Sequence, residues 1–402
     1  MPPRQHIGAQ LAQSNVMRRA VVLALVGLAA VGAILWFQGR TVRSSEPVSS
    51  TLPTRSGPDR PDRAAAARVV SREARLESLS RAQVWREPAR GAGGGHLPAH
   101  AVIDELSCRF VLKRLSGTTP KFNCVLDTGE EVRIKYGKGA EIPAEAAATR
   151  LLRALGFAAD EIVLVRRLRC YGCPLEPFTT SKAVQTVKAG GVYEHALDYD
   201  DFHDHEWVAL ERKYDAWPIE TAMQEGWEFP ELDRIDASKG GAPRAHVDAL
   251  RIAAVFLAHW DNKSENQRLV CESREWPEGR PCAAPVVLLQ DLGGSFGPRK
   301  VSLRRWRVST IWADRTQCLV TMRHLPYSGA TFQDVRVGEA GRQLAARLLG
   351  RLTDEEIVDL FSAARFDQKR GLFSDVRPVA GWVEAFKARV RLISEGPPCP
   401  PV

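Results

Sequence analysis

Two polar stretches of this sequence are the most informative about its fold: HWDNKSEN at residues 259–266 and QDLGGSFG at residues 290–297. The first follows residues 243–259, which are apolar nearly all round and therefore predict a buried helix. The second follows VVLL at 286–289, which predicts a short apolar strand. Each polar stretch therefore begins where a buried element ends, which predicts that both lie at one site.

Read alone, each stretch fits a turn, because Asp, Asn and Gly favour turns. Together they fit phosphoryl transfer, which needs a carboxylate at the acceptor hydroxyl and oxygen ligands on a divalent metal. Asp261 and Asn266 lie five residues apart in a loop that leaves a rigid helix, which suits a base and a metal ligand. Asp291, at the end of the strand, can face them as the other metal ligand, and Gly293 lets the backbone turn sharply beside it.

The same reaction needs a Lys on the nucleotide phosphates. The run VRIK at 132–135 predicts a strand that ends in Lys135, and residues 143–155 predict a helix that carries Glu145. Glu145 and Leu152 are seven residues apart and share one helical face, so that face can bring Glu145 to Lys135. Taken singly, Lys135 fits an exposed strand charge and Glu145 a first-turn complement to the helix dipole.

These motifs resemble those of the protein-kinase superfamily. HWDNKSEN resembles the HRDLKPEN catalytic loop, DLG at 291–293 the DFG motif, and VRIK the VAIK motif. The pattern from Asp291 to Phe296-Gly297 is closer to the atypical branch, namely secretory-pathway, lipid and HipA-type kinases. The resemblance covers residues 105–300 in motif order and extends more weakly into the C-terminal part.

The resemblance implies a role for each residue. Asp261 would be the catalytic base, Asn266 and Asp291 would bind Mg²⁺ or Mn²⁺, and Lys135 would contact the α- and β-phosphates of ATP while paired with Glu145. The implied partners are therefore a nucleotide and an unidentified hydroxyl-bearing acceptor, which could be a protein, a glycan or a small molecule.

The resemblance also implies two further nucleotide contacts. A hinge near Leu210–Tyr214 would hold adenine, which makes Leu210 a nucleotide-binding residue. The phosphate-covering turn contains Gly117 alone instead of a G-x-G-x-x-G loop. Trp260 replaces the Arg that reads an activation-loop phosphate in regulated kinases, so that form of control is not expected.

Two other functions fit parts of the sequence. A pseudokinase that keeps the fold as a binding or sensor module is one alternative. The run GGSFG at 293–297 also fits the G-x-S-x-G elbow of serine hydrolases, which would make Ser295 the nucleophile. That elbow needs a helix immediately after it, and PRKVSL at 298–303 does not predict one.

Charge divides the chain in two. It has 56 basic and 48 acidic residues, a net charge of +8. Residues 1–38 carry three Arg and no acid, residues 39–100 carry 11 Arg against six acids, and residues 101–402 are balanced. A nucleic-acid-binding fold is therefore not supported, because neutralising phosphates needs positive charge on the folded surface.

Residues 20–37 form an 18-residue run without a charge or Pro. At 1.5 Å per residue such a helix just spans a hydrocarbon core of roughly 30 Å. We therefore expect a short tail at 1–19 and a transmembrane helix or signal anchor at 20–38, with the lipid bilayer as a partner. A cleaved signal peptide is the alternative.

The chain contains an even number of cysteines, eight. Cys271 and Cys282 flank a short Pro- and Gly-containing loop that a disulfide could close. Cys170 and Cys173 could be half of a zinc site, but a disulfide or free thiols fit better because no second pair at metal spacing accompanies them. We expect the folded part to lie outside the cytoplasm, in a periplasm or lumen.

The sequence predicts an α+β fold, a two-lobed kinase-like domain behind the membrane helix and a linker. Residues 39–100, rich in Ser, Pro, Arg, Ala and Gly, predict a disordered linker. We expect the N-lobe at 101–212 and the C-lobe at 213–396. Residues 194–206, which gather acids and three His, are expected to be a solvated loop. The other predicted elements are strands at 108–112, 122–126, 132–135, 162–165 and 207–210 and helices at 340–352, 354–364 and 382–393.

Overall fold

The computed structural model describes residues 68–88, 95–98, 102–273, 275–277, 279–298, 300–326, 329–368 and 378–401. These residues belong to one unit of the chain, Val48–Val402. The predicted tail at 1–19 and the predicted span at 20–38 lie outside them. Within the described ranges, no helix combines the length and the apolar character needed to cross a bilayer.

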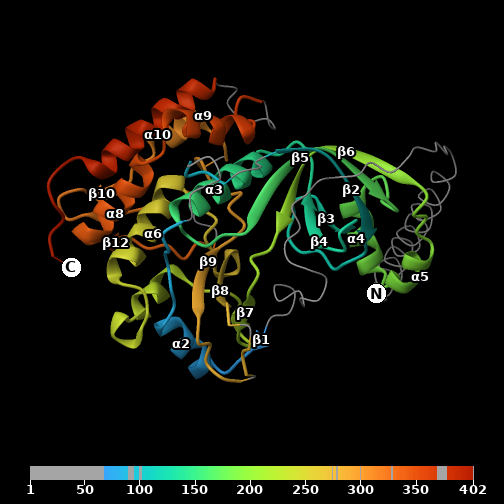
Figure 1. Ribbon diagram of the computed structural model, residues 1–402, viewed down its shortest axis with the longest axis horizontal. Coiled ribbons are helices and arrows are strands. Elements are labelled where there is room, and N and C mark those ends of the chain that lie inside the picture. The colour runs from blue at the N-terminus through green and yellow to red at the C-terminus, as the bar shows by residue number, and fades with distance from the viewer. Residues whose placement is uncertain are drawn as a thin grey trace, which may run out of the picture. The chain divides into compact units, whose positions relative to one another are not determined.

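The first part of the fold is a closed five-stranded barrel (Figure 1). Neighbouring strands pair antiparallel except for the pair that closes the barrel, which is parallel. In spatial order the strands are β2 (Val102–Val111), β3 (Lys121–Leu126), β4 (Glu131–Lys135), β6 (Phe202–Arg212) and β5 (Glu161–Tyr171).

The strands of the barrel alternate between two faces. Phe122, Ile134 and Leu210 point into the barrel, where each is fully buried. Lys121 and Lys135 are cross-strand partners, and each lies one position away from such an inward residue. Since successive side chains of a strand point to opposite faces, both lysines lie on the outer face. That face meets the rest of the protein.

Helix α3 (Glu141–Leu155) packs between the barrel and the helical part of the chain (Figure 1). It ends at Gly156, whose positive φ of 92° and close approach to the backbone oxygen of Arg86 leave no room for a side chain. Helices α4 (Pro177–Thr186) and α5 (Gly190–His195) connect β5 to β6. The prediction of a loop over 194–206 is wrong at 202–206, because these residues pair with β5 as the outer end of β6.

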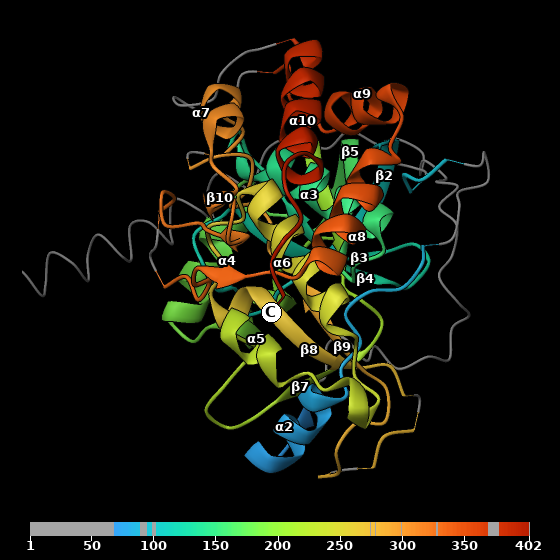
Figure 2. The ribbon, with the colours of Figure 1, turned by 90° about the vertical axis from the view of Figure 1, so that its left-hand side faces the viewer.

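The second part of the fold combines a sheet with helices, so the predicted α+β class is confirmed. Helix α8 (Glu339–Gly350) packs against α6 (Arg244–Leu257), and α10 (Val379–Ser394) packs against α8 and α9 (Asp354–Ala363) (Figure 2). The sheet runs in the order β1 (Arg68–Val69), β7 (Trp217–Glu220), β8 (Gln267–Cys271) and β9 (Pro285–Leu289). The helices are α6 (Arg244–Leu257), α7 (Leu303–Val308), α8 (Glu339–Gly350), α9 (Asp354–Ala363) and α10 (Val379–Ser394). Three 3₁₀ turns (Phe229–Arg234, Ala237–Lys239 and Ser264–Asn266) and a small sheet, β10 (Trp312–Asp314), β11 (Leu319–Val320) and β12 (Val335–Arg336), complete it.

A buried arginine fixes the end of α6. Arg389 of α10 is fully buried, and its guanidinium donates hydrogen bonds to the backbone oxygens of Val255 and Phe256 at 3.1 Å. It also donates to the backbone oxygen of Trp306 at 2.9 Å. A cation at a helix C-terminus satisfies carbonyls that have no partner in the helix. The polar stretch 259–266 therefore starts from an anchored point.

The prediction of a linker over 39–100 is wrong for residues 68–88, which we call the strap. Helix α2 (Arg72–Ser80) is capped by Ser71, and Leu79 is fully buried. Beyond it, Gln83 bridges to Val286 of β9 and Trp85 bridges to Phe157, after α3. The strap thus joins the two parts of the fold.

The strap is rich in arginine, and two of its arginines are neutralised on folding by carboxylates far away in sequence. Arg75 is 1% exposed and binds both carboxylate oxygens of Glu231 at 2.8 and 2.9 Å. Arg86 binds both oxygens of Glu272 at 2.9 and 2.6 Å. An arginine-rich segment can be ordered when carboxylates far away in sequence pair with it.

All eight cysteines form disulfides. The predicted closure of the loop between Cys271 and Cys282 is confirmed, and Cys170 and Cys173 form a disulfide instead of half a zinc site. The other two disulfides join Cys108 to Cys124 on the neighbouring strands β2 and β3, and Cys318 to Cys399 near the C-terminus.

We predict that Leu79→Ala lowers the free energy of unfolding by about 2–5 kcal/mol, because it removes a fully buried side chain from the core. Denaturant unfolding measures this change. The matched control on the same helix is Glu77→Ala, whose side chain is 59% exposed, with an expected change below about 0.5 kcal/mol. Equal and negligible effects of both changes would show that the strap is a linker after all.

Candidate active site

Four elements converge on one buried lysine. The ammonium of Lys135, at the end of β4, contacts the carboxylate of Glu145 of α3 at 2.6 and 2.8 Å. It lies 3.5 Å from Glu211 of β6 and 3.4 Å from Asp291, which follows β9. Lys135, Glu145 and Glu211 are each at most 3% exposed, whereas the Asp291 side chain is 44% exposed. Asp291 is therefore the member of the cluster open to a ligand.

Lys135 and the carboxylates around it shift one another's pKa values. Burial raises the pKa of Glu145 to about 8, although the charge of Lys135 opposes this effect. Burial lowers the pKa of Lys135, but the carboxylates of Glu145, Glu211 and Asp291 outweigh it and hold that pKa well above its ordinary value. Burial raises the pKa of Asp291, yet the charges of Lys135, Lys121 and Lys213 together lower it more, so its pKa falls below the ordinary value. At neutral pH the cluster therefore presents an ammonium beside an ionised, half-exposed carboxylate.

The stretch 259–266 is a rigid loop held by its own amides. The side-chain amide of Asn262 donates to the backbone oxygen of His259 and accepts from the backbone N–H groups of Thr331 and Phe332 at 2.9 and 2.8 Å. The Nδ2 group of Asn266 donates to the backbone oxygen of Asp261 at 2.5 Å. This bond leaves the Oδ1 atom of Asn266 as the atom that can ligate a cation.

The backbone also ties this loop to the stretch 290–297. The backbone N–H of Gln290 donates to the oxygen of Asn266 at 3.0 Å, which continues the β8–β9 ladder. The N–H of Trp260 donates to the oxygen of Gly294 at 3.1 Å. Asp261, on the next position, has a 31% exposed side chain. The predicted base, Asp261, and both predicted metal ligands, Asn266 and Asp291, therefore lie along one edge of the fold, where the stretches 259–266 and 290–297 are hydrogen-bonded to each other.

The two glycines after Asp291 are required by space. A Cβ atom on Gly293 would lie 2.2 Å from Cγ of Glu141 on α3, and one on Gly294 would lie 2.8 Å from Cβ of Asp261. The φ of Gly293 is not positive, so the sharp backbone turn expected there is not the reason for a glycine. The reason is the close approach of Glu141. Asp291 itself has a φ of 49°, a left-handed conformation that side chains adopt at a cost and that is common at functional sites.

The donors at this edge fit a hard divalent cation. The carboxylate of Asp291 and the amide oxygen of Asn266 are the oxygen ligands that Mg²⁺ prefers. Within the described ranges, no group of three His, Cys, Asp or Glu side chains could hold a metal unaided. A cation bound here would therefore take its remaining ligands from water and phosphate, as Mg²⁺ does in phosphoryl-transfer sites.

Three predicted residues take no part in the ion pairs of this cluster. Leu210 points into the barrel and is fully buried, so its side chain cannot contact a nucleotide. Gly117 lies in the exposed turn between β2 and β3 with a φ of 70°. Ser295 is fully buried and its hydroxyl has no hydrogen-bond partner, and the next helix, α7, starts only at Leu303. This geometry does not support a serine hydrolase.

The structure adds residues that the sequence analysis missed. Glu211 directly follows the apolar run 207–210, and a charged residue at the end of such a run is the sequence signal that could have indicated its place in the site. Lys213, beyond it, contacts Glu211 and donates to Asp160 at 2.8 Å. The carboxylate of Asp160 also accepts from the backbone N–H of Tyr214 at 2.9 Å, so it fixes the segment that joins the barrel to β7.

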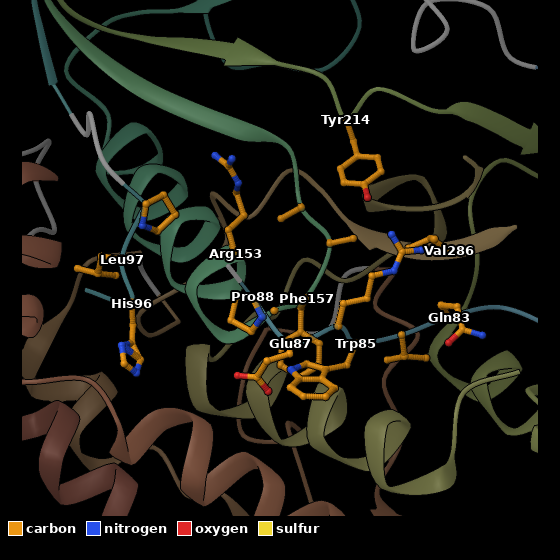
Figure 3. A pocket seen from close by; sticks show the side chains of 16 residues that line it. Gln83, Trp85, Glu87, Pro88, His96, Leu97, Arg153, Phe157, Tyr214 and Val286 are labelled. Carbon is orange, nitrogen blue, oxygen red and sulfur yellow. The ribbon is translucent and has the colours of Figure 1, made fainter. Parts of the chain in front are cut away.

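A separate cavity lies away from this cluster. It has a volume of about 370 Å³ and is lined by the end of the strap, residues 96–98, the turn after α3, Tyr214 and Val286 (Figure 3). None of the proposed catalytic or metal-binding residues lines it.

Comparison with known proteins finds matches among solved structures. Neither a protein-family model nor a curated protein matches the sequence. The structure is similar to the crystal structure of a Helicobacter pylori proinflammatory kinase, CtkA, with 11% sequence identity and a TM-score of 0.39. The similarity covers 72% of this chain and 96% of the other.

The buried His259 predicts a pH dependence of stability. Burial lowers the pKa of His259 to about 4, and neither ring nitrogen has a hydrogen-bond partner. The unfolded chain, with a His pKa near 6.5, binds a proton that the folded chain excludes. Stability present above pH 6.5 is therefore lost as the pH falls toward 4, by about 3 kcal/mol.

Denaturant unfolding of the wild type and of His259→Leu across this pH range measures the effect. We expect the difference in unfolding free energy between the two proteins to change by about 3 kcal/mol in favour of the variant on going from pH 6.5 to 4. A constant difference would mean that folding does not lower the pKa of His259.

Proposed function

We propose that this protein is a kinase-like phosphotransferase that moves the γ-phosphoryl group of ATP to a hydroxyl acceptor with the help of Mg²⁺ or Mn²⁺. The observation that carries the proposal is the contact between two distant motifs: the buried Lys135–Glu145 pair lies 3.4 Å from Asp291. Asp291 in turn follows the strand whose backbone is paired with Asn266. A lysine, two oxygen ligands and an accessible carboxylate are the parts that phosphoryl transfer requires, and the carboxylate of Asp261 is 31% exposed.

Each residue has a defined task in this mechanism. Lys135, oriented by Glu145, binds phosphate oxygens, and Asn266 and Asp291 hold the cation. Bound there, the cation neutralises the charge that develops on the phosphates. Asp261, whose carboxylate is accessible, orients the acceptor hydroxyl and accepts its proton. Little covalent work remains for the protein, because positioning and charge neutralisation supply most of the rate.

The proposal includes the location of the domain. Four disulfides support an oxidising compartment outside the cytoplasm, since such bonds are rare where thiols are kept reduced. The apolar run at 20–38 would anchor the chain to the bilayer, with the folded domain in a periplasm or lumen.

Nucleotide binding tests the proposal first. We predict that ATP with Mn²⁺ raises the melting temperature of the folded protein by several degrees at 100 times the dissociation constant, equivalent to about 2.7 kcal/mol. The Asp291→Ala variant should lose the part of this shift that depends on the metal. No shift in the wild type, together with unchanged behaviour of the variant, would contradict the proposal.

Turnover tests it second. Asp261→Asn removes the base but keeps the size of the side chain, so we predict that ATP binding is retained and phosphoryl transfer falls about 100-fold or more. The control is Asp104→Asn, whose side chain is 78% exposed on β2. Autophosphorylation or ATP hydrolysis, measured with labelled ATP, gives the rate. Binding without any turnover in the wild type would favour the pseudokinase alternative.

A further inference from the structure

A second buried lysine lies beside the candidate active site. Lys121 is the first residue of β3, directly after the turn that contains Gly117. Its side chain is 9% exposed, and no carboxylate in the described part of the chain lies within ion-pair distance of its ammonium. Most of the residue is buried, but its Nζ atom is not among the fully buried polar atoms that lack a partner, so the ammonium can be reached from outside. An ammonium held in such a place without a counter-ion is unfavourable, so its presence needs a reason.

The position of Lys121 makes this cost larger. Lys121 is the direct cross-strand partner of Lys135, and like charges at such positions repel each other. Lys135 has Glu145 as its counter-ion, whereas Lys121 has none. Burial is the main cause that lowers the pKa of Lys121, and the charges of Lys135 and Arg133 lower it further. Asp291 and Glu211 only partly oppose this effect.

The ammonium of Lys121 lies next to Gly117, in the turn between β2 and β3. A Cβ atom built on Gly117 would be 3.4 Å from its Nζ atom, which is ordinary contact distance. Lys121 and Lys135 point out of the same face of the barrel, toward the edge where Asp291 lies. An anion between this turn and Asp291 would therefore meet two ammonium groups, one of them unpaired.

We propose that Lys121 is a second phosphate-binding residue, which holds the triphosphate of the nucleotide from beneath the Gly117 turn. The inference rests on the proposed function and deepens it. A turn with one glycine cannot wrap its backbone N–H groups around phosphates as a loop with three glycines does. A lysine supplies the missing charge as a compact, mobile cation. The bound phosphate in turn removes the repulsion between the two lysines.

A purely structural role is the competing explanation, because the aliphatic stem of a lysine can cover apolar surface. The two roles differ in what they predict for ligands. A phosphate contact affects ATP and ADP but not adenosine, whereas a structural role affects all three ligands and the stability of the free protein.

The test is titration calorimetry of the full chain and its variants with ATP, ADP and adenosine in the presence of Mg²⁺. For Lys121→Met we expect the affinity for ATP to fall about 10- to 100-fold, the loss of one charge-assisted contact, and the affinity for adenosine to change less than about threefold. The melting temperature of the unliganded variant should be equal to or higher than that of the wild type. The control is Lys113→Met, which removes a 44% exposed lysine of the same turn and should leave all three affinities unchanged.

Two variants keep the inference falsifiable if Lys121→Met does not fold. Lys121→Arg retains the charge and should keep ATP affinity within about tenfold, whereas Lys121→Gln should show the loss expected for Lys121→Met. Wild-type affinity for ATP in Lys121→Met or Lys121→Gln, or an equal loss for ATP and adenosine, would overturn the inference and leave the proposed function standing. Failure of the wild type to bind any nucleotide would overturn both.

Discussion

The buried charge of Lys135 is the constraint on which the rest of this structure depends. An ammonium with 3% exposure is tolerated only where carboxylates compensate it, and removing one partner of such a pair costs about 3–5 kcal/mol. Its partners come from a helix, a neighbouring strand and the turn after β9: Glu145, Glu211 and Asp291. Compensating one charge therefore fixes the barrel, α3 and the sheet of the second part relative to one another.

The surrounding structure keeps this arrangement rigid. Arg389 satisfies the carbonyls at the end of α6, and the loop at 259–266 starts from that anchored point. The strap joins β9 to the turn after α3, so it spans the same two parts of the fold as the charged cluster does. Rigid support of this kind lets a site of few side chains hold a ligand in one geometry. The half-exposed carboxylate of Asp291 is left as the point of access.

The sequence predicted the elements whose signals are local. The helix predicted at 143–155, which the structure has as Glu141–Leu155, and the disulfide between Cys271 and Cys282 follow from periodicity and spacing. It did not predict that residues 68–88 fold, because two of their arginines, Arg75 and Arg86, pair with acids 156 or more residues away. The orientation of Leu210 was missed for a related reason: a strand buried on both faces does not show which face meets the site. The unpaired Lys121 is visible only once the pairing of β3 with β4 is known.

The central claim is that nucleotide phosphates lie against the lysines on the outer face of the barrel. An acyl-phosphate derivative of ATP tests it directly, because such a reagent acylates the amines that lie next to the bound phosphates, and mass spectrometry of the digested protein identifies them. We expect acylation of Lys135 or Lys121 that excess ATP with Mg²⁺ suppresses. Acylation confined to exposed lysines and insensitive to ATP would contradict it.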